Sequence, residues 1–228
     1  MFYKQELCNW DDPEEASLCL KIAGLSLRNS EYTLIGGLPS AHYFDIDSYL
    51  MENKNNATAL AKLLADKINQ LSKSHEFNKV AFIEKGGAGP VGLISIRSTL
   101  GTLIEKEMII IRSKKRLLRG TIKGSLNKDD RVIILSDVAT IGWTIFEAAE
   151  KVWDLGAKVP YALVVIDRDQ GATVNLGRKG IELLSIYTAK TIREKKGSEL
   201  KEHYKTGIED RFIMQLVDFG GSSSTSVY

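Results

Sequence analysis

The spacing of hydrophobic residues along the chain changes near residue 78. Before that point, apolar residues recur at intervals of three and four, which is the period of a helix with one buried face. This spacing predicts helices over 13–24 and 56–72. Two short strand-like runs lie between them, over 31–35 and 41–46, separated by turn residues at 36–39. The N-terminal part is therefore expected to hold two short strands between two helices.

Beyond residue 78, continuous apolar runs alternate with helical segments. Runs without polar interruption predict strands that are buried on both faces; they cover 79–83, 108–111, 131–135, 159–166 and 181–186. Helices are expected between them, over 90–100 and 143–155 and in a short segment before the last strand. Helices between buried strands indicate a parallel sheet covered on both sides, so the predicted fold class is α/β, doubly wound. Ligands of such sheets bind at the carboxyl ends of the strands, so the loops that follow the strands are the places to seek chemistry.

Composition narrows the class of protein. A chain of 228 residues is long enough for one large domain, and its 43% hydrophobic and 26% charged residues exclude a disordered chain, a collagen and a disulfide scaffold. Lys and Arg number 31 against 29 Asp and Glu, so the charge gives no reason to expect a nucleic acid or a membrane as partner. Cys8 and Cys19 are interpreted as reduced thiols. With no apolar run near the ~20 residues that span a bilayer and no signal core over 1–12, a cytoplasmic protein is expected.

Residues 131–144, RVIILSDVATIGWT, carry the strongest chemical signal. A buried strand runs into Asp137, then into a small and hydroxylic turn, then into a helix, and this order directs backbone N–H groups and a helix N-terminus at one spot that favours a phosphate. Thr140 and Thr144 can add hydroxyl donors. Asp137 would be repelled by a phosphate, but it can accept hydrogen bonds from ribose hydroxyls or reach Mg²⁺. A phosphorylated sugar fits this combination; the alternative is that Asp137 or Thr140 only caps the helix.

The same stretch resembles the phosphoribosyl pyrophosphate (PRPP) signature of type I phosphoribosyltransferases. That signature has four apolar residues, two acids, an apolar residue, any residue, Thr, Ser or Thr, Gly, any residue, and Ser or Thr. Residues 156–188, with Asp167-Arg168 and Gly180-Ile181, resemble the matching part of orotate phosphoribosyltransferases. Residues 32–47 resemble that family's N-terminal element through Ser40, Tyr43 and Asp45.

The resemblance covers about residues 13–195 and implies a domain organisation. We expect a doubly wound, mostly parallel sheet of the type I phosphoribosyltransferase kind. The N-terminal helix and a small hood element would occupy 1–50, the α/β core 51–195, and a C-terminal extension with a frayed tail 196–228.

The resemblance also implies a set of site residues. PRPP would be bound by Ser136, Asp137, Val138, Ala139, Thr140, Ile141, Gly142, Trp143, Thr144 and Arg112. The pyrophosphate loop would be Lys85, Gly86, Gly87 and Ala88. The base would be bound by Arg168, Tyr43 and Ile35, with the Arg168 guanidinium on the orotate carboxylate; the alternative for Arg168 is an ion pair with Asp167 or Asp169. Mg²⁺ is implied as cofactor, held mainly through PRPP with Asp137 as a weak protein ligand.

Residues 112–119 carry five cations within eight residues. Such a run is commonly a solvated charged segment. In the family, however, a mobile loop at this place closes over PRPP and donates to the leaving pyrophosphate, commonly in a neighbouring subunit. The resemblance therefore implies a homodimer with the basic loop near the neighbouring subunit, and catalytic roles for Asp137, Lys114, Lys115 and Arg116.

The chain departs from the family pattern in several places, among them Ile141, which replaces a usual small or hydroxylic residue, and the bulky Trp143 at a variable position. Ser136 stands where the first of two acids is usual, Glu84-Lys85 stands where Gly-Pro is usual, Ile35 stands where some members have Lys, and the basic loop lacks a His. The first hypothesis is phosphoribosyl transfer from PRPP to orotate, giving orotidine 5′-monophosphate and pyrophosphate. Two alternatives stay open: a transferase acting on another base, and a non-catalytic relative that binds PRPP or a nucleotide as a regulator.

Overall fold

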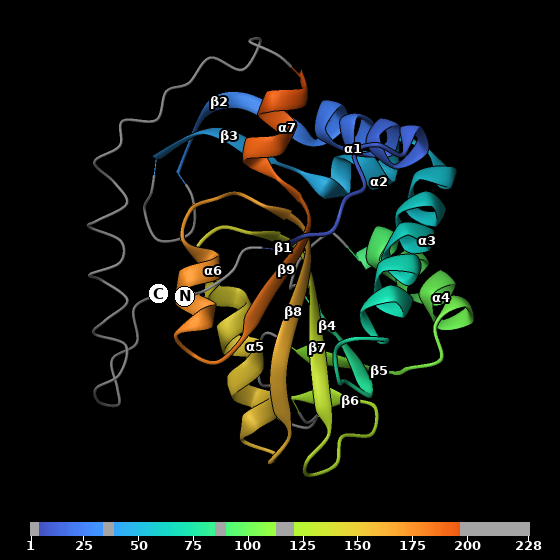
Figure 1. Ribbon diagram of the computed structural model, residues 1–228, viewed down its shortest axis with the longest axis vertical. Helices are drawn as coiled ribbons and strands as arrows, with labels where there is room; N and C mark the ends of the chain where they lie inside the picture. Colours follow the sequence, from blue (N-terminus) through green and yellow to red (C-terminus); the bar gives the residue numbers. More distant parts are fainter. Residues whose placement is uncertain (1–4, 34–38, 85–89, 113–120, 197–228) are drawn as a thin grey trace.

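The computed structural model describes the backbone of residues 5–33, 39–84, 90–112 and 121–196 and, outside 25–43, 54, 90–95 and 196, their side chains (Figure 1). Within these residues, seven strands form one sheet in the order β1-β9-β8-β7-β4-β5-β6. Every neighbouring pair is parallel except β5 and β6. The strands are β1 (Gln5–Glu6), β4 (Lys79–Glu84), β5 (Glu107–Arg112), β6 (Ile122–Lys123), β7 (Arg131–Ala139), β8 (Lys158–Asp167) and β9 (Glu182–Thr188).

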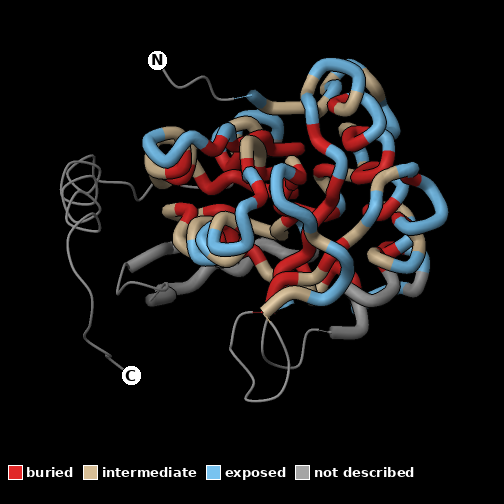
Figure 2. The backbone as a smooth tube through the Cα atoms, turned by 90° about the horizontal axis from the view of Figure 1, so that it is seen from below, coloured by how far each residue is buried: buried red, intermediate tan, exposed pale blue. Residues whose placement is uncertain are grey.

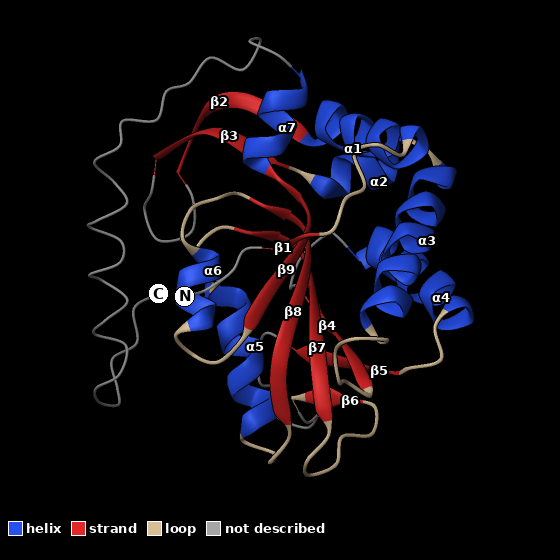
Figure 3. Cartoon of the chain, viewed as in Figure 1, coloured by secondary structure: helices blue, strands red, loops and turns tan. Residues whose placement is uncertain are grey.

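Helices cover both faces of this sheet (Figure 3). Ile133 and Leu135 belong to one hydrophobic cluster, whereas Val132 and Ile134 belong to the other, so β7 supplies apolar side chains to both faces. This is the physical reason for its uninterrupted apolar run, and it confirms the predicted doubly wound α/β fold. One face carries α1 (Pro13–Ser26), α2 (Ile46–Glu52), α3 (Lys54–Leu71) and α4 (Pro90–Leu103), and the other carries α5 (Trp143–Trp153) and α6 (Ala172–Gly177). Figure 2 shows the buried residues gathered in the middle of the molecule.

The two short N-terminal strands form a separate antiparallel pair, β2 (Leu27–Thr33) and β3 (Pro39–Phe44). The predicted turn between them lies almost wholly outside the described residues. The prediction that the second strand runs to residue 46 was wrong, because the Asp45 carboxylate accepts a hydrogen bond from the Ser48 N–H and caps α2. Helix α2 was not predicted, and neither was α7 (Ala189–Lys196) after β9.

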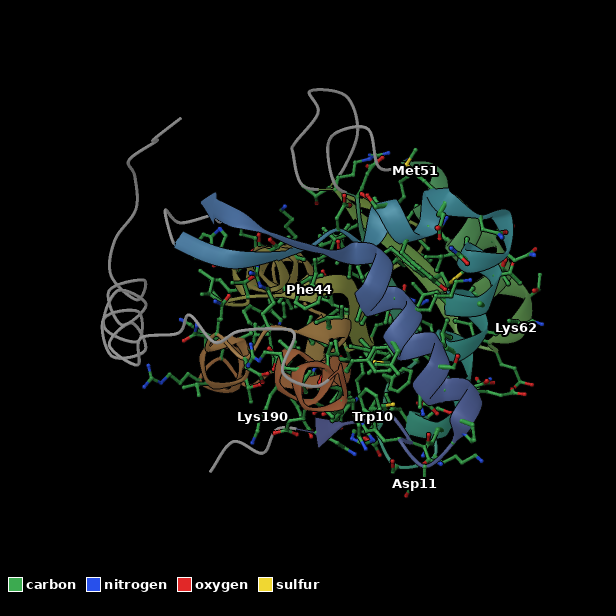
Figure 4. All side chains as sticks on the ribbon, turned by 90° about the horizontal axis from the view of Figure 1, so that it is seen from above. Trp10, Asp11, Phe44, Met51, Lys62 and Lys190 are labelled. Atoms are coloured by element: carbon green, nitrogen blue, oxygen red, sulfur yellow. The ribbon has the colours of Figure 1, made fainter. Side chains whose placement is uncertain are left out.

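The carboxyl ends of the long parallel strands meet at one edge of the sheet. Glu84 at the end of β4 pairs with Arg112 at the end of β5, and Asp167 at the end of β8 pairs with both Ala139 and Thr188. The β2–β3 pair lies above this edge in Figure 1, and Figure 4 looks down on the molecule from that side, with Phe44 at the end of β3 labelled. The fold therefore brings the strand ends that precede the loops singled out by the sequence to one edge of the sheet.

Candidate active site at the carboxyl ends of the strands

The strand–turn–helix pattern predicted over 131–144 is present, with one shift of boundary. Residues 136–139, expected in the turn, belong to the end of β7, because β8 remains paired with them up to Ala139 and Asp167. The β7–α5 turn consequently comprises only residues 140–142, and α5 begins at Trp143. The N-cap of α5 is Gly142, which has no side chain, so neither Asp137 nor Thr140 occupies the capping position.

Gly142 is required in this turn for two independent reasons. Its φ of +86° lies in the left-handed region, which glycine adopts without strain. A Cβ at this position would also lie 2.8 Å from Leu176 Cγ, closer than two carbon atoms can approach. The turn is thus shaped by its backbone, and it presents the N-terminus of α5, with its partial positive charge, at the carboxyl edge of the sheet.

Ser136 and Asp137 interact with each other at the end of β7. Asp137 Oδ1 accepts a hydrogen bond from the Val138 N–H at 2.8 Å and a second from Ser136 Oγ at 3.2 Å. Both side chains are half-buried. Ser136, which occupies the place of an acid, therefore holds the remaining carboxylate in this structure.

A contact that the sequence did not predict fixes the β7–α5 turn from the side. Asn175, on α6, donates from Nδ2 to the carbonyl oxygen of Ile141 at 2.9 Å. The two residues are 34 positions apart, and only the prediction of a short helix before the last strand hinted at this neighbourhood. A pocket runs between this turn and α6; its lining is Ile141, Gly142, Trp143, Phe146, Asn175, Leu176, Arg178 and Lys179.

Asp167 and Arg168, at the end of β8, are almost completely buried, with 2% and 4% of their surface exposed. The Arg168 N–H donates to the carbonyl oxygen of Ala139 at 2.9 Å, so its backbone is joined to the end of β7. Asp167 accepts hydrogen bonds from the Asp169 N–H at 3.0 Å and from Thr173 Oγ1 at 3.3 Å. A buried polar group persists in a fold where it is hydrogen-bonded, and the Asp167 carboxylate accepts these two hydrogen bonds.

Arg112, at the end of β5, forms an ion pair that the sequence did not predict. Its Nε lies 3.3 Å from Glu84 Oε2, as the pairing of the two residues on adjacent strands allows. Its N–H donates to the carbonyl oxygen of Thr121 at 2.8 Å, and its carbonyl oxygen accepts from Lys151 Nζ at 3.0 Å. Arg112 thus stands at the base of the basic loop, held by the residue just beyond it and by α5.

The remaining predicted site residues cannot be placed with side chains. Tyr43 is described only as a backbone position on β3, where it pairs with Arg28. Eight others lie outside the described residues: Ile35, Lys85, Gly86, Gly87, Ala88, Lys114, Lys115 and Arg116. The structure therefore brings together residues 136–144, Arg112 and Arg168, and it leaves the two loops as sequence predictions.

The described residues offer little to a metal ion or to covalent catalysis. No group of three or more His, Cys, Asp or Glu side chains that could hold a metal occurs among them. Both cysteines are free, and burial raises the pKa of Cys8 to about 12, with Glu15 and Glu6 adding to the effect, so this thiol stays protonated at neutral pH.

Among the helices of the described segments, none is long and apolar enough to cross a membrane.

Comparisons of the whole chain with known proteins find orotate phosphoribosyltransferases among its relatives. No family model matches the chain. An orotate phosphoribosyltransferase of Pyrococcus abyssi is 31% identical over 175 residues, which cover 75% of this chain and 90% of the relative. The crystal structure of the orotate phosphoribosyltransferase of Aeropyrum pernix superposes with a TM-score of 0.62 at 28% identity, covering 79% of this chain and 99% of that one. The Mycobacterium tuberculosis enzyme in complex with PRPP shares the fold, with a TM-score of 0.58 at 18% identity, over 80% of this chain and 93% of that one.

Proposed function

The chain belongs to the orotate phosphoribosyltransferase family, and we propose that its site at the carboxyl ends of β7 and β8 transfers the phosphoribosyl group of PRPP to orotate. In this reaction a ring nitrogen of orotate forms a bond to the anomeric carbon of the ribose as the bond from that carbon to pyrophosphate breaks. The products are orotidine 5′-monophosphate and pyrophosphate. The observation that carries the proposal is the hydrogen bond from the Arg168 N–H, just after β8, to the carbonyl oxygen of Ala139, the last residue of β7 before the β7–α5 turn.

The β7–α5 turn would bind the 5′-phosphate of PRPP. The backbone N–H groups of residues 139–143 and the N-terminus of α5 are donors suited to an anion, and the hydroxyl groups of Thr140 and Thr144 add to them. The requirement for glycine at position 142 supports this role, since a side chain there would displace the turn from α6.

The carboxylate of Asp137 would accept hydrogen bonds from the ribose hydroxyls. The first acid of the family pattern is replaced by Ser136 here, and the serine hydroxyl group donates to Asp137 in this structure. A carboxylate held by two donors keeps a fixed direction, and this suits the binding of neutral hydroxyl groups.

The base would be held by Arg168, together with Tyr43 and Ile35 from the β2–β3 region. A guanidinium binds a carboxylate with two parallel hydrogen bonds, and the burial of Arg168 favours recognition of a charged group rather than a neutral one. The carboxylate on the pyrimidine ring of orotate is the feature that would distinguish it from uracil at this position.

The leaving pyrophosphate would be stabilised by positive charge and backbone donors. We assign these roles to Lys85, Gly86, Gly87 and Ala88 and to the cations Arg112, Lys114, Lys115 and Arg116. Positioning and charge stabilisation suffice for such a transfer. Asp137 alone is a poor metal site, so Mg²⁺ would be held mainly by oxygen atoms of PRPP, where it would offset the charge of the departing pyrophosphate. We further propose a cytoplasmic homodimer in which the basic loop lies near the neighbouring subunit.

The experiment that tests this function is a pyrophosphate-release assay with PRPP and Mg²⁺ across orotate, uracil, adenine and hypoxanthine. Turnover with orotate alone is expected. Turnover with another base instead would assign the chain to a different substrate. Ser136 favours one second candidate, a relative that binds PRPP or a nucleotide without turnover; binding by calorimetry with no pyrophosphate released from any base would establish it.

A further inference from the structure

We propose that Asn175 is a positioning residue that locks the peptide between Ile141 and Gly142, so that the Gly142 N–H faces the 5′-phosphate. This inference rests on the proposed function, because it assigns the β7–α5 turn to a phosphate. It adds a residue that lies on another element, α6, and that the sequence patterns do not single out.

The orientation of this peptide follows from one hydrogen bond. The carbonyl oxygen of Ile141 accepts from Asn175 Nδ2 at 2.9 Å, so it points toward α6. The described peptide bonds are all trans, and in a planar trans peptide the C=O and the following N–H point in opposite directions. The Gly142 N–H therefore points away from α6, to the side of the turn where we place the phosphate.

Because residue 142 is a glycine, the peptide between Ile141 and Gly142 can flip easily. Position 142 is a glycine with φ of +86°, and glycine populates positive and negative φ almost equally. Rotation of the 141–142 peptide would replace the N–H that faces the phosphate by a carbonyl oxygen, which repels it. Because Gly142 offers little resistance to that rotation, a restraint is needed elsewhere, and the Asn175 amide supplies it.

The Asn175 side chain is poorly explained by folding stability alone. Within the described part of the chain its Oδ1 atom is buried and has no hydrogen-bond donor. A buried acceptor without a donor destabilises a fold, and leucine would fill nearly the same space without that cost. The retained amide is thus better explained by what its nitrogen does to the Ile141 carbonyl.

The test compares the full-length protein with Asn175→Leu, which preserves the volume of the side chain and removes the donor. The loss of one neutral hydrogen bond should weaken binding of ribose 5-phosphate, measured by calorimetry, by about three- to tenfold. KM for PRPP should rise by a similar factor, whereas kcat, KM for orotate and Tm should stay within error or Tm should rise. Val174→Ala on the same helix is the matched control and should behave as the wild type.

A second measurement reports on the peptide itself. In ¹⁵N-labelled wild-type protein, ribose 5-phosphate should move the Gly142 amide resonance, and in Asn175→Leu the same addition should move it much less. Wild-type affinity in Asn175→Leu would overturn the proposal, and so would a parallel loss of PRPP affinity, orotate affinity and Tm, which indicates a merely structural residue. If the wild type binds ribose 5-phosphate but transfers nothing to orotate, the proposed function fails while the role of Asn175 is still decided by the binding data.

Discussion

The backbone N–H of Arg168 donates to the carbonyl oxygen of Ala139 at 2.9 Å, and this bond joins the first residue after β8 to the last residue of β7. One residue is the candidate for the base, and the other opens the turn that is the candidate for the phosphate. The candidate positions for the base and for the phosphate are therefore built on adjacent parallel strands, whose relative position is fixed by the sheet. Rigid elements of this kind can hold the two reactants of a transfer at a constant separation.

Replacement of Arg168 by Ala should remove the partner of the orotate carboxylate. Loss of a charged, bidentate partner in a buried site costs on the order of 2–5 kcal/mol of binding free energy. We expect orotate affinity, measured by calorimetry, to fall by at least about thirtyfold while PRPP affinity is kept. Arg178→Ala, which removes an exposed arginine at the end of α6, is the matched control. Undiminished orotate binding in Arg168→Ala would assign Arg168 to an ion pair with Asp167 or Asp169 instead.

Substitution of two glycines with similar backbone conformations can separate the cost of backbone strain from the cost of a steric clash. Gly142 and Gly180 have φ of +86° and +77°, but a Cβ would meet Leu176 at the first and nothing within 4 Å at the second. Gly180→Ala should therefore lower the free energy of unfolding by about 1 kcal/mol through strain alone and leave PRPP binding intact. Gly142→Ala should cost more and should also abolish PRPP binding, because the turn must move away from α6. Thermal unfolding and calorimetry check both effects; equal behaviour of the two variants would contradict this account.

The elements with a long apolar pattern could be predicted from the sequence, whereas those that depend on a single capping residue or on contacts between distant segments could not. The strand that ends in Ser136 and Asp137 is visible because both of its faces are buried, which leaves a continuous apolar run. Helix α2 was missed because its start depends on the Asp45 cap. From the sequence alone, Asp45 could equally be a residue of the preceding strand. The Asn175 contact with Ile141 and the Arg112 ion pair with Glu84 arise only when separate segments are brought together.

Asp130 lies at the opposite end of the sheet and should make the free energy of unfolding depend on pH. Burial acts to raise its pKa, but the Asn127 N–H at 2.7 Å, the Asn78 amide at 2.6 Å and the ammonium of Lys79 at 3.7 Å lower the pKa below its ordinary value. A carboxyl group whose pKa is lower in the folded state adds stability above its unfolded pKa, near 3.9, and this contribution disappears as pH falls through the folded pKa.

Asp130→Asn should accordingly be less stable than the wild type at pH 7, by about 1–3 kcal/mol for the lost charged hydrogen bonds. The difference should shrink below about pH 4, as the wild-type carboxyl group becomes protonated. Urea unfolding between pH 2 and 7 measures it, with exposed Asp129→Asn as the control. A difference that does not change with pH would show that Asp130 acts through its shape rather than its charge.

The last prediction concerns Ser136, which replaces an acid and donates to Asp137. A hydrogen bond to a charged group contributes roughly 1.5–3 kcal/mol, against about 0.5–1.5 for a neutral pair, so the missing carboxylate is expected to slow transfer by about ten- to a hundredfold. Ser136→Asp should therefore raise kcat/KM for PRPP with orotate and steepen its dependence on Mg²⁺, because two adjacent carboxylates repel each other unless a cation lies between them.

Ser136→Ala serves as the matched variant, since it removes the hydrogen bond to Asp137 without adding charge. It should weaken PRPP binding by up to about tenfold, and the pair of variants separates the two roles of the serine. If Ser136→Asp slows an enzyme that is already fast, Ser136 is not a defect but the group that fixes Asp137, and Ser136→Ala must then be slow as well. If both variants bind PRPP and neither they nor the wild type transfer to any base, Asp137 is held for binding alone, and the regulatory candidate replaces the enzyme.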